Sequence, residues 1–582
     1  METRRVILLM IFIGSLFLLW DAWMRQSLPP VQQTQQTQQT QQGQQAQQGA
    51  SVAGANPTTP APTNGQAASN VPTSTSSGGA VLPQATTNLN APAPGPVNTP
   101  ASAIAATPAG QRFLLKNNSL ELTVDSLGGV LVGAKLLDQA SDNYDGGLVK
   151  LFDIQTDRRF EAQSGLVAPP GFAKVLPNHT VPFVVQPLKA GQDPGRTIVL
   201  ASESGGVKLI KTFSIEPSGH SVKVQHTVLN TGADAIAPNV YLQFLRTGNA
   251  APGESQFYQT FTGPAIYTEQ AKFQKISFSD IEKGRQDYVR QANDGWLSIV
   301  QHYFVSSWVL KNEAPREFYT RKVGENLYTA GLIQSFSPIA PGAQQTHEAL
   351  LYVGPQTQRT LEVLAPGLDL VVDYGFLTFL SKPIYWLLEQ LHKLVQNWGW
   401  AIVLLTILIK LLFYPLSAAS YRSMAKMKAV TPRLMALRER YPHDKAKLNQ
   451  AMMELYKTEK INPLGGCLPV LVQIPVFLAL YWVLLASVEM RNAPWILWIS
   501  DLSSPDPFYI LPIVMAITMF IQTKLNPAPP DPLQAKVMMF MPLVFSVFFF
   551  FFPAGLVLYW LINNVVSIAQ QWVIMKRMNV AI

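Results

Sequence analysis

A single lysine inside an apolar segment is the side chain of this sequence with the clearest capacity for chemistry. Lys410 lies within the run 401–417, AIVLLTILIKLLFYPLS. An ammonium group there is costly, and it marks either a functional site or the end of a membrane helix. Pro415 and Ser417 mark the helix end, which lies about two turns, or roughly 10 Å, beyond Lys410. A lysine stem can carry its charge most of that way to the membrane interface, so position alone leaves both interpretations open.

Other polar side chains lie at a similar depth in the apolar segments. Thr406 precedes Lys410 by four residues and shares its helix face, whereas Gln473, Asn563 and Asn564 occupy other apolar segments. One amide or hydroxyl in a membrane helix often serves only to join two helices. A lysine accompanied by several such groups instead predicts a water-filled cavity. None of the five predicted spans after residue 395 contains Asp or Glu, which argues against a proton- or sodium-coupled transporter.

Covalent chemistry is not indicated by the sequence. It contains no glycine-rich phosphate loop, no G-x-S-x-G and no H-E-x-x-H. Cys467 is the only cysteine, which excludes an intrachain disulfide and a cysteine-based metal cluster. His220, His226 and His302 lie in or beside strand-like segments, where an ordinary structural role is the simpler interpretation. We therefore expect no catalytic residue, no metal and no cofactor.

The elements that position these polar residues are apolar segments. Hydrophobic residues make up 48% of the chain and charged residues 14%, and the apolar excess is concentrated near residue 10 and after residue 395. This distribution predicts a multi-pass α-helical membrane protein with six spans. Residues 1–25 combine Arg4 and Arg5 with an apolar run and lack a small-residue cleavage site, as in an uncleaved signal anchor. The other predicted spans are 398–417, 466–487, 508–523, 537–552 and 555–575.

Two of the predicted spans are short. Residues 508–523 and 537–552 contain 16 residues each and are interrupted by Pro512 and Pro542. As helices they measure about 24 Å, against a hydrocarbon core of about 30 Å. A membrane accommodates short helices by thinning locally, which shortens the path across it.

The loop 418–462 sets the expected orientation. It carries ten basic and four acidic residues, whereas 488–507 carries one basic and three acidic residues. The positive-inside rule therefore places 418–462 in the cytoplasm, and six spans place both termini there too. We expect a helical hairpin whose methionines and basic side chains contact partners, anionic lipid or ribosomal RNA; alternatively, the methionines form the hairpin's own seam. The predicted contact residues are Met424, Met427, Arg433, Arg438, Met452 and Met453.

Residues 112–355 have the pattern of an antiparallel β-sandwich outside the membrane. Apolar and polar residues alternate in 120–124 and 222–228, and glycine-containing turns separate such segments. Residues 26–111 contain no charged, histidine or aromatic residue, which predicts a disordered tether. Residues 375–395 have apolar side chains at helical spacing. They predict an amphipathic helix at the outer membrane interface or, alternatively, a helix packed on the β-domain.

Several stretches together resemble the YidC family of membrane protein insertases. The resemblance covers the chain apart from the tether, and the large β-domain is similar to that of the Gram-negative form. The stretches are NPLGGCLPVLVQIPVFLALYW (462–482), FPAGLVLYW (552–560), YILPIVMAITMF (509–520), YRSMAKMKAVTP (421–432) and GWLSIVQHYFVSSW (295–308).

This resemblance implies a five-helix core within 396–582, around a hydrophilic groove that opens to the cytoplasm and to lipid. The groove cation of the family is usually arginine, and Lys410 occupies its position. Lysine keeps the charge but lacks the planar fork that holds a carboxylate through two hydrogen bonds. Many relatives carry a long basic tail, whereas this chain ends soon after Lys576 and Arg577, so ribosome contact is expected to depend on the hairpin. The resemblance places at other groove positions Thr406, Gln473, Asn563, Asn564, Tyr559 and Trp560.

The implied function is the insertion and folding of inner-membrane proteins, without enzymatic chemistry. The implied partners are nascent inner-membrane proteins, the Sec translocon with its accessory subunits, ribosome–nascent chain complexes and membrane lipids. Two alternatives belong to other classes. One is a solute transporter; the other is a membrane-anchored carbohydrate-binding domain, because the family's β-sandwich resembles sugar-mutarotase folds.

Overall fold

The computed structural model describes residues 110–578. The exceptions within this range are 142, 144–146, 170, 171, 173, 253, 255–259, 443, 460–467 and 527–531. The predicted signal anchor (1–25) and all but the end of the predicted tether (26–111) lie outside the described residues.

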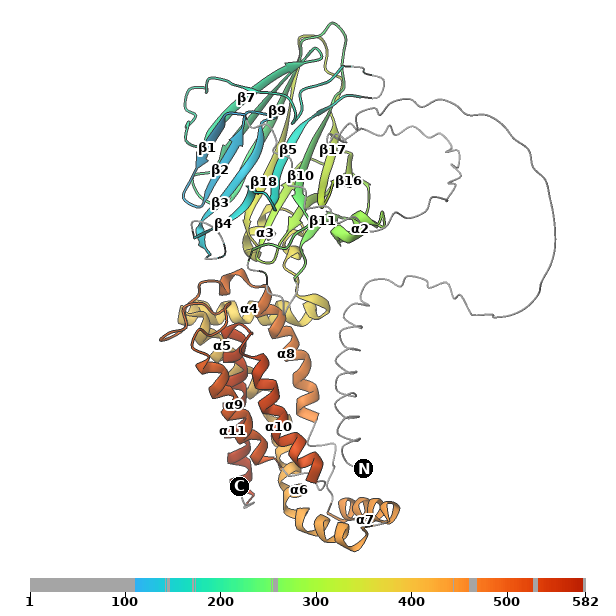
Figure 1. The fold of residues 1–582 in the computed structure, drawn as a ribbon, viewed down its shortest axis with the longest axis vertical. Coiled ribbons are helices and arrows are strands. Elements are labelled where there is room, and N and C mark those ends of the chain that lie inside the picture. The colour runs from blue at the N-terminus through green and yellow to red at the C-terminus, as the bar shows by residue number, and fades with distance from the viewer. Residues whose placement is uncertain are drawn as a thin grey trace, which may run out of the picture. The chain divides into compact units, whose positions relative to one another are not determined.

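Two nine-stranded antiparallel sheets form the described chain between Arg112 and Pro355 (Figure 1). The predicted antiparallel β-sandwich is therefore confirmed. In spatial order, the first sheet consists of β1 (Arg112–Lys116), β2 (Leu120–Asp125), β3 (Val130–Ala140), β4 (Leu148–Ile154), β5 (Arg159–Val167), β10 (Asn239–Thr247), β17 (Leu327–Ser335), β16 (Arg316–Gly324) and β13 (Gln291–Ala292). The second sheet consists of β12 (Lys272–Lys275), β11 (Gly263–Thr268), β14 (Trp296–Val300), β15 (Phe304–Val309), β18 (Gln344–Pro355), β9 (Ser221–Asn230), β8 (Val207–Ile215), β7 (Thr197–Ser204) and β6 (Val184–Val185).

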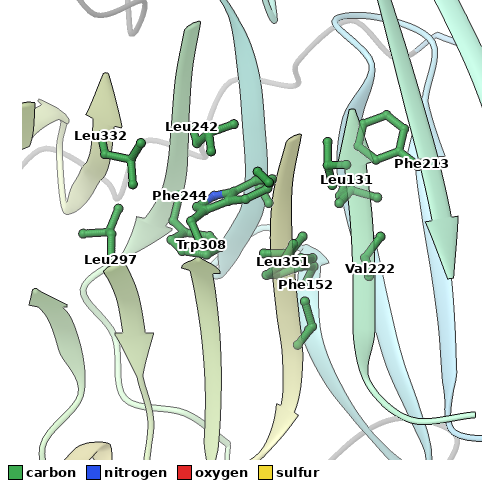
Figure 2. Close-up of a cluster of buried hydrophobic side chains, with 14 of the residues drawn as sticks. Leu131, Phe152, Phe213, Val222, Leu242, Phe244, Leu297, Trp308, Leu332 and Leu351 are labelled. Atoms are coloured by element: carbon green, nitrogen blue, oxygen red, sulfur yellow. The ribbon is translucent and has the colours of Figure 1, made fainter. Parts of the chain in front are cut away.

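A hydrophobic core fills the space between the two sheets (Figure 2). Every second residue of β8 is buried, because side chains alternate between the two faces of a strand. Trp308 of β15 and Phe244 of β10 meet in this core, with ring centroids 6.0 Å apart. Burying one side chain of this size stabilises the fold by about 1.5–3 kcal/mol relative to leaving it exposed.

Three buried polar side chains lie on neighbouring strands within the same core. Lys211 (β8), His226 (β9) and His347 (β18) lie side by side in register, and all three are buried. Lys211 Nζ donates to the carbonyl oxygens of Gly128 (2.6 Å) and Ser164 (2.7 Å). His226 Nε2 lies 2.8 Å from Ser164 Oγ. Burial lowers the pKa of Lys211 to about 7 and the pKa of His347 to about 4.

The stability of the β-sandwich is therefore expected to fall as the pH is lowered from about 7 to about 5. Burial holds the pKa values of His226 and His347 below the ordinary 6.5, so the unfolded chain binds protons that the folded domain excludes. For His347 alone the loss at about pH 5 is on the order of 2 kcal/mol. Calorimetry of the full chain in detergent at the two pH values measures this difference, and His347→Gln is expected to reduce it. Equal unfolding midpoints at both pH values would contradict the prediction.

Helices occupy most of the described chain after Pro355 (Figure 1). The short helix α2 (Phe278–Glu282) lies within the β region. The later helices are α3 (Gln358–Leu364), η1 (Leu368–Val371), η2 (Gly375–Leu377), α4 (Thr378–Val395), α5 (Trp398–Leu412), α6 (Tyr414–Arg440), α7 (Lys445–Thr458), α8 (Leu468–Ala486), η4 (Val488–Met490), α9 (Ile510–Leu525), α10 (Pro532–Phe548) and α11 (Ala554–Arg577). Helix α11 packs against α5 and α9, and α4 packs against α5 and α8.

Helix length alone does not identify six membrane spans among the described residues. Helix α11 is the one described helix that is long and apolar enough to cross a bilayer by itself. Helices α5 and α6 pass the same criterion only as a pair, bent by 67° at Phe413. The six-span topology stays a prediction, because the remaining apolar helices are shorter. They are Val472–Ala486, Ile510–Leu525 and Met539–Phe548.

Helix α4 has one face against other helices and another face exposed. Ser381 Oγ donates to Ala479 O of α8 at 3.2 Å, and Tyr385 Oη donates to Glu489 Oε1 at 2.8 Å. Phe379 on the same helix is exposed. This division agrees with the amphipathic pattern of 375–395 in the sequence.

Candidate functional site

Three helices bring Lys410 into contact with polar side chains. The Lys410 ammonium group on α5 donates to Ser567 Oγ of α11 at 2.7 Å and to Gln473 Oε1 of α8 at 3.3 Å. The Gln570 amide of α11 donates to the Lys410 carbonyl oxygen at 3.3 Å. Lys410 is only 3% exposed, so its charge is directed to neighbouring helices and not to the end of α5. This geometry favours a polar site over a lysine that reaches back to the membrane interface.

Ser567 holds the ammonium group in a defined position. Its hydroxyl donates to the carbonyl oxygen of Asn563, one turn earlier in α11, at 2.7 Å. A serine hydroxyl has one donor hydrogen and two acceptor lone pairs. Asn563 receives its donor hydrogen and Lys410 occupies one of its lone pairs, which together fix its orientation.

A cavity of about 270 Å³ lies beside this contact. Four helices supply its walls, which combine aromatic rings with hydroxyl and amide groups. The lining residues are Ser417, Ser420, Tyr421 and Met424 of α6, Gln473, Ile474 and Phe477 of α8, Gln522 and Asn526 at the end of α9, and Tyr559, Trp560, Asn563, Asn564 and Ser567 of α11. Lys410 is not a lining residue, but both side-chain acceptors of its ammonium group, Gln473 and Ser567, are.

Most of the predicted groove residues come together at this cavity. Gln473, Asn563, Asn564, Tyr559 and Trp560 line it. Lys410 adjoins it through two of the lining side chains.

Thr406 is the predicted groove residue that the structure places away from the cavity. It is buried, and its hydroxyl donates to the carbonyl oxygen of Ile402 in the same helix at 2.7 Å. Thr406 shares a helix face with Lys410, but the two residues are separated by roughly 6 Å along the helix axis. A threonine hydroxyl in a helix reaches the carbonyl oxygen four residues earlier, so the Thr406 hydroxyl is satisfied within α5.

The cavity has an aromatic side and an amide side. Phe477 of α8 packs edge-on against Trp560, with ring centroids 4.5 Å apart, and stacks on Tyr559 at 6.1 Å. On the amide side, Gln522 Nε2 donates to Gln571 Oε1 at 2.9 Å, which joins α9 to α11. Such a surface accepts both apolar and hydrophilic parts of a polypeptide.

The methionines predicted for the cytoplasmic hairpin have different surroundings. Met427 and Met452 pack against Val430 and Leu434, so these two methionines form the seam between α6 and α7. For Met427 and Met452, the structure therefore agrees with the alternative prediction that the methionines form the hairpin's own seam. Met424 lines the cavity instead.

The other predicted hairpin residues lie nearer the surface. Met453 is exposed on α7, and Arg438 lies in the last turn of α6. Arg433 forms an ion pair with Glu459 at 2.5 Å. Because the Arg433 side chain is largely exposed, this pair contributes little to stability.

Eight residues that line the cavity were not predicted as site residues: Ser417, Ser420, Tyr421, Ile474, Phe477, Gln522, Asn526 and Ser567. The available signal for Ser567 was its spacing, since it follows Asn563 by four residues and shares its helix face. Ser420 and Tyr421 follow the bend at Phe413, and no local pattern specifies the angle of that bend.

Comparisons with known proteins cover both the β-sandwich and the helices. The family described as "YidC periplasmic domain" matches residues 112–387, and that described as "60Kd inner membrane protein" matches residues 390–581. A membrane protein insertase YidC from Cupriavidus taiwanensis is 48% identical over 99% of this chain and 98% of its own length. The chain belongs to the YidC family of membrane protein insertases. A YidC relative from Ralstonia nicotianae is 46% identical over 99% of this chain and 98% of its own.

Among solved structures, the crystal structure of an active YidC insertase with its first transmembrane domain resolved is similar to this chain. It is 19% identical and matches 80% of this chain and 92% of its own, with a TM-score of 0.37.

As a member of the YidC family, this chain is a membrane protein insertase of the inner membrane with a periplasmic domain. Its substrates are nascent membrane proteins, and its function is not enzymatic. Similarity to insertases over the full length does not favour a solute transporter or a carbohydrate-binding protein.

Proposed function

We propose that this insertase receives the hydrophilic part of a nascent membrane protein in the cavity beside Lys410. Transfer of a carboxylate out of water costs several kcal/mol unless a partner offsets the lost hydration. A buried ammonium group next to the cavity supplies that partner. The aromatic side of the cavity accommodates the apolar residues that flank the hydrophilic segment.

The contacts of Lys410 carry this proposal. The ammonium group is held by a hydroxyl and an amide oxygen, which are both neutral acceptors. A hydrogen bond between an ammonium group and a carboxylate is roughly twice as strong as one between neutral groups. An acidic segment that enters the cavity therefore gains a stronger contact with Lys410 than the neutral acceptors provide.

The proposed topology has six spans, with both termini and the hairpin in the cytoplasm. Positive charge in 418–462 supports this orientation. The proposed divisions are a signal anchor (1–25), a tether (26–111), a periplasmic β-sandwich (112–355), an interfacial helix (375–395) and a five-span core (396–582) that includes the hairpin (418–462).

The proposed exit route for the apolar helix of the substrate runs along the predicted spans 466–487 and 537–552. Exposed apolar side chains on α10, including Phe540 and Val544, support this route, because they present a surface that lipid and an apolar helix both favour. The shortness of α9 and α10 supports local thinning of the bilayer, which reduces the distance that the hydrophilic segment crosses.

Further proposed partners are the Sec translocon with its accessory subunits, ribosome–nascent chain complexes and membrane lipids. The ten basic residues of 418–462 support contacts with ribosomal RNA and anionic headgroups.

Insertion into liposomes tests the proposed role of Lys410. The purified chain is reconstituted, and a small membrane protein with an acidic tail is scored for protease-protected insertion. We expect insertion by the wild type and by Lys410→Arg, which keeps the charge, and at least a tenfold loss in Lys410→Ala, roughly the effect of losing one charge-assisted hydrogen bond. Full activity in Lys410→Ala would limit Lys410 to a structural role.

A further inference from the structure

The ammonium group of Lys410 is covered in this structure. Its two acceptors, Gln473 Oε1 and Ser567 Oγ, belong to residues that line the cavity, whereas Lys410 itself does not. A substrate carboxylate reaches the ammonium group only after one of these two side chains moves aside.

Ser567 is the less mobile of the two covering side chains. Its bond to Lys410 is short, at 2.7 Å, and its hydroxyl also donates to the carbonyl oxygen of Asn563 in its own helix. Moving it would break two hydrogen bonds in a buried site, which is costly because each partner would lose its bond without gaining water.

Gln473 is the more mobile covering side chain. Its bond to Lys410 is 3.3 Å long, which is beyond the usual 2.7–3.2 Å of a strong hydrogen bond. A glutamine side chain has three rotatable bonds and is only partly buried here, so it can turn into the cavity that it already lines. Among the described residues, Lys410 is the one hydrogen-bond partner identified for the Gln473 amide.

We propose that Gln473 is a specificity-determining residue that covers Lys410 and gives up its place to an acidic group of the substrate. This inference rests on the proposed function of the cavity. A carboxylate displaces the amide oxygen because it forms the stronger bond with the ammonium group. A neutral or basic segment gains nothing from this exchange, so Lys410 stays covered and does not repel it. The cover therefore lets one cavity accept acidic segments through Lys410 and other segments without it.

A negative charge placed at position 473 tests whether Gln473 competes with the substrate for Lys410. Gln473→Glu supplies an internal carboxylate that competes with the substrate for Lys410. We expect insertion of an acidic-tailed substrate to fall by about tenfold, as expected when a charge-assisted bond must be displaced, and insertion of a neutral-tailed substrate to stay near the wild-type level. Gln522→Glu is the matched control, because Gln522 lines the same cavity but bonds to Gln571. If both variants reduce the insertion of both substrates to the same extent, Gln473 does not act as the cover of Lys410.

A variant without the amide oxygen tests whether Gln473 covers Lys410 or simply contacts the substrate. Gln473→Met conserves the length of the side chain but leaves Lys410 one acceptor short. We expect it to insert the acidic-tailed substrate at least as well as the wild type. A loss of insertion with both substrates would identify Gln473 as an ordinary contact and overturn the proposal.

The reactivity of the lysine provides a measurement that does not depend on insertion. Reductive methylation of the full-length protein with formaldehyde and a borohydride, read by mass spectrometry of the Lys410 peptide, reports access to the amine. We expect severalfold faster methylation in Gln473→Ala, which removes the covering side chain, than in the wild type and no change in Gln522→Ala. Equal rates in all three proteins would show that Gln473 does not cover Lys410, whatever the outcome of the insertion assay.

Discussion

Replacing Lys410 with glutamate is expected to reduce the insertion of an acidic-tailed substrate by roughly a hundredfold. The variant places a carboxylate where the substrate carboxylate is expected to bind. Two like charges about 5 Å apart at an effective dielectric constant of about 20 repel each other by about 3 kcal/mol, and about 1.4 kcal/mol corresponds to a factor of ten. Protease-protected insertion into liposomes measures the effect, with acidic-tailed and neutral-tailed versions of one substrate.

The control for this charge reversal is Lys426→Glu. Lys426 is exposed on α6 and is not a lining residue of the cavity. Lys426→Glu changes the net charge of the protein by the same amount as Lys410→Glu, but away from the cavity. We expect it to insert both substrates at close to the wild-type level. Equal insertion of the two substrates by Lys410→Glu would contradict a role for the groove charge.

At about pH 10, where most of the cost of deprotonating Lys211 on folding is gone, replacing Lys211 with methionine is expected to destabilise the β-sandwich by about 3 kcal/mol, because two buried carbonyl oxygens lose their donor. These are the oxygens of Gly128 and Ser164, 2.6 and 2.7 Å from Lys211 Nζ. Methionine fills a similar volume, so the loss reports mainly the hydrogen bonds and not an empty space. The unfolding midpoint of the β-sandwich in the full-length protein, followed by calorimetry, measures the change.

The same variant is expected to change how stability depends on pH. In the wild type, burial lowers the pKa of Lys211 to about 7, against 10.5 for an ordinary lysine. Between these values the unfolded chain binds a proton that the folded domain releases, so stability rises with pH. Lys211→Met lacks this rise. Lys208→Met on the opposite face of β8 is the control and is expected to keep it; an unchanged pH profile in Lys211→Met would disprove the role of Lys211.

Alternation along the strands made the β-sandwich predictable from the sequence. In 222–228, period two places His226 on the same face as Val222 and Val224, so the local pattern already directs His226 into the core. The pattern did not identify its partner. Ser164 is separated from His226 by 62 residues and comes from the opposite sheet, so their contact depends on how the two sheets pack.

For the site too, the sequence identified individual residues, whereas the tertiary structure determined their contacts. Composition and helical spacing were sufficient to single out Lys410 and to associate it with Gln473, Asn563 and Asn564, because a polar group in an apolar helix is costly wherever that helix packs. The partners of Lys410 were decided by the tertiary structure. Ser567 lies 157 residues away and Gln473 lies 63 residues away, yet both contact the ammonium group. Thr406, four residues away, does not line the cavity with them. Spacing along one helix determines which face a side chain occupies, whereas contact between helices depends on their packing and on the bend between α5 and α6, which only the folded chain sets.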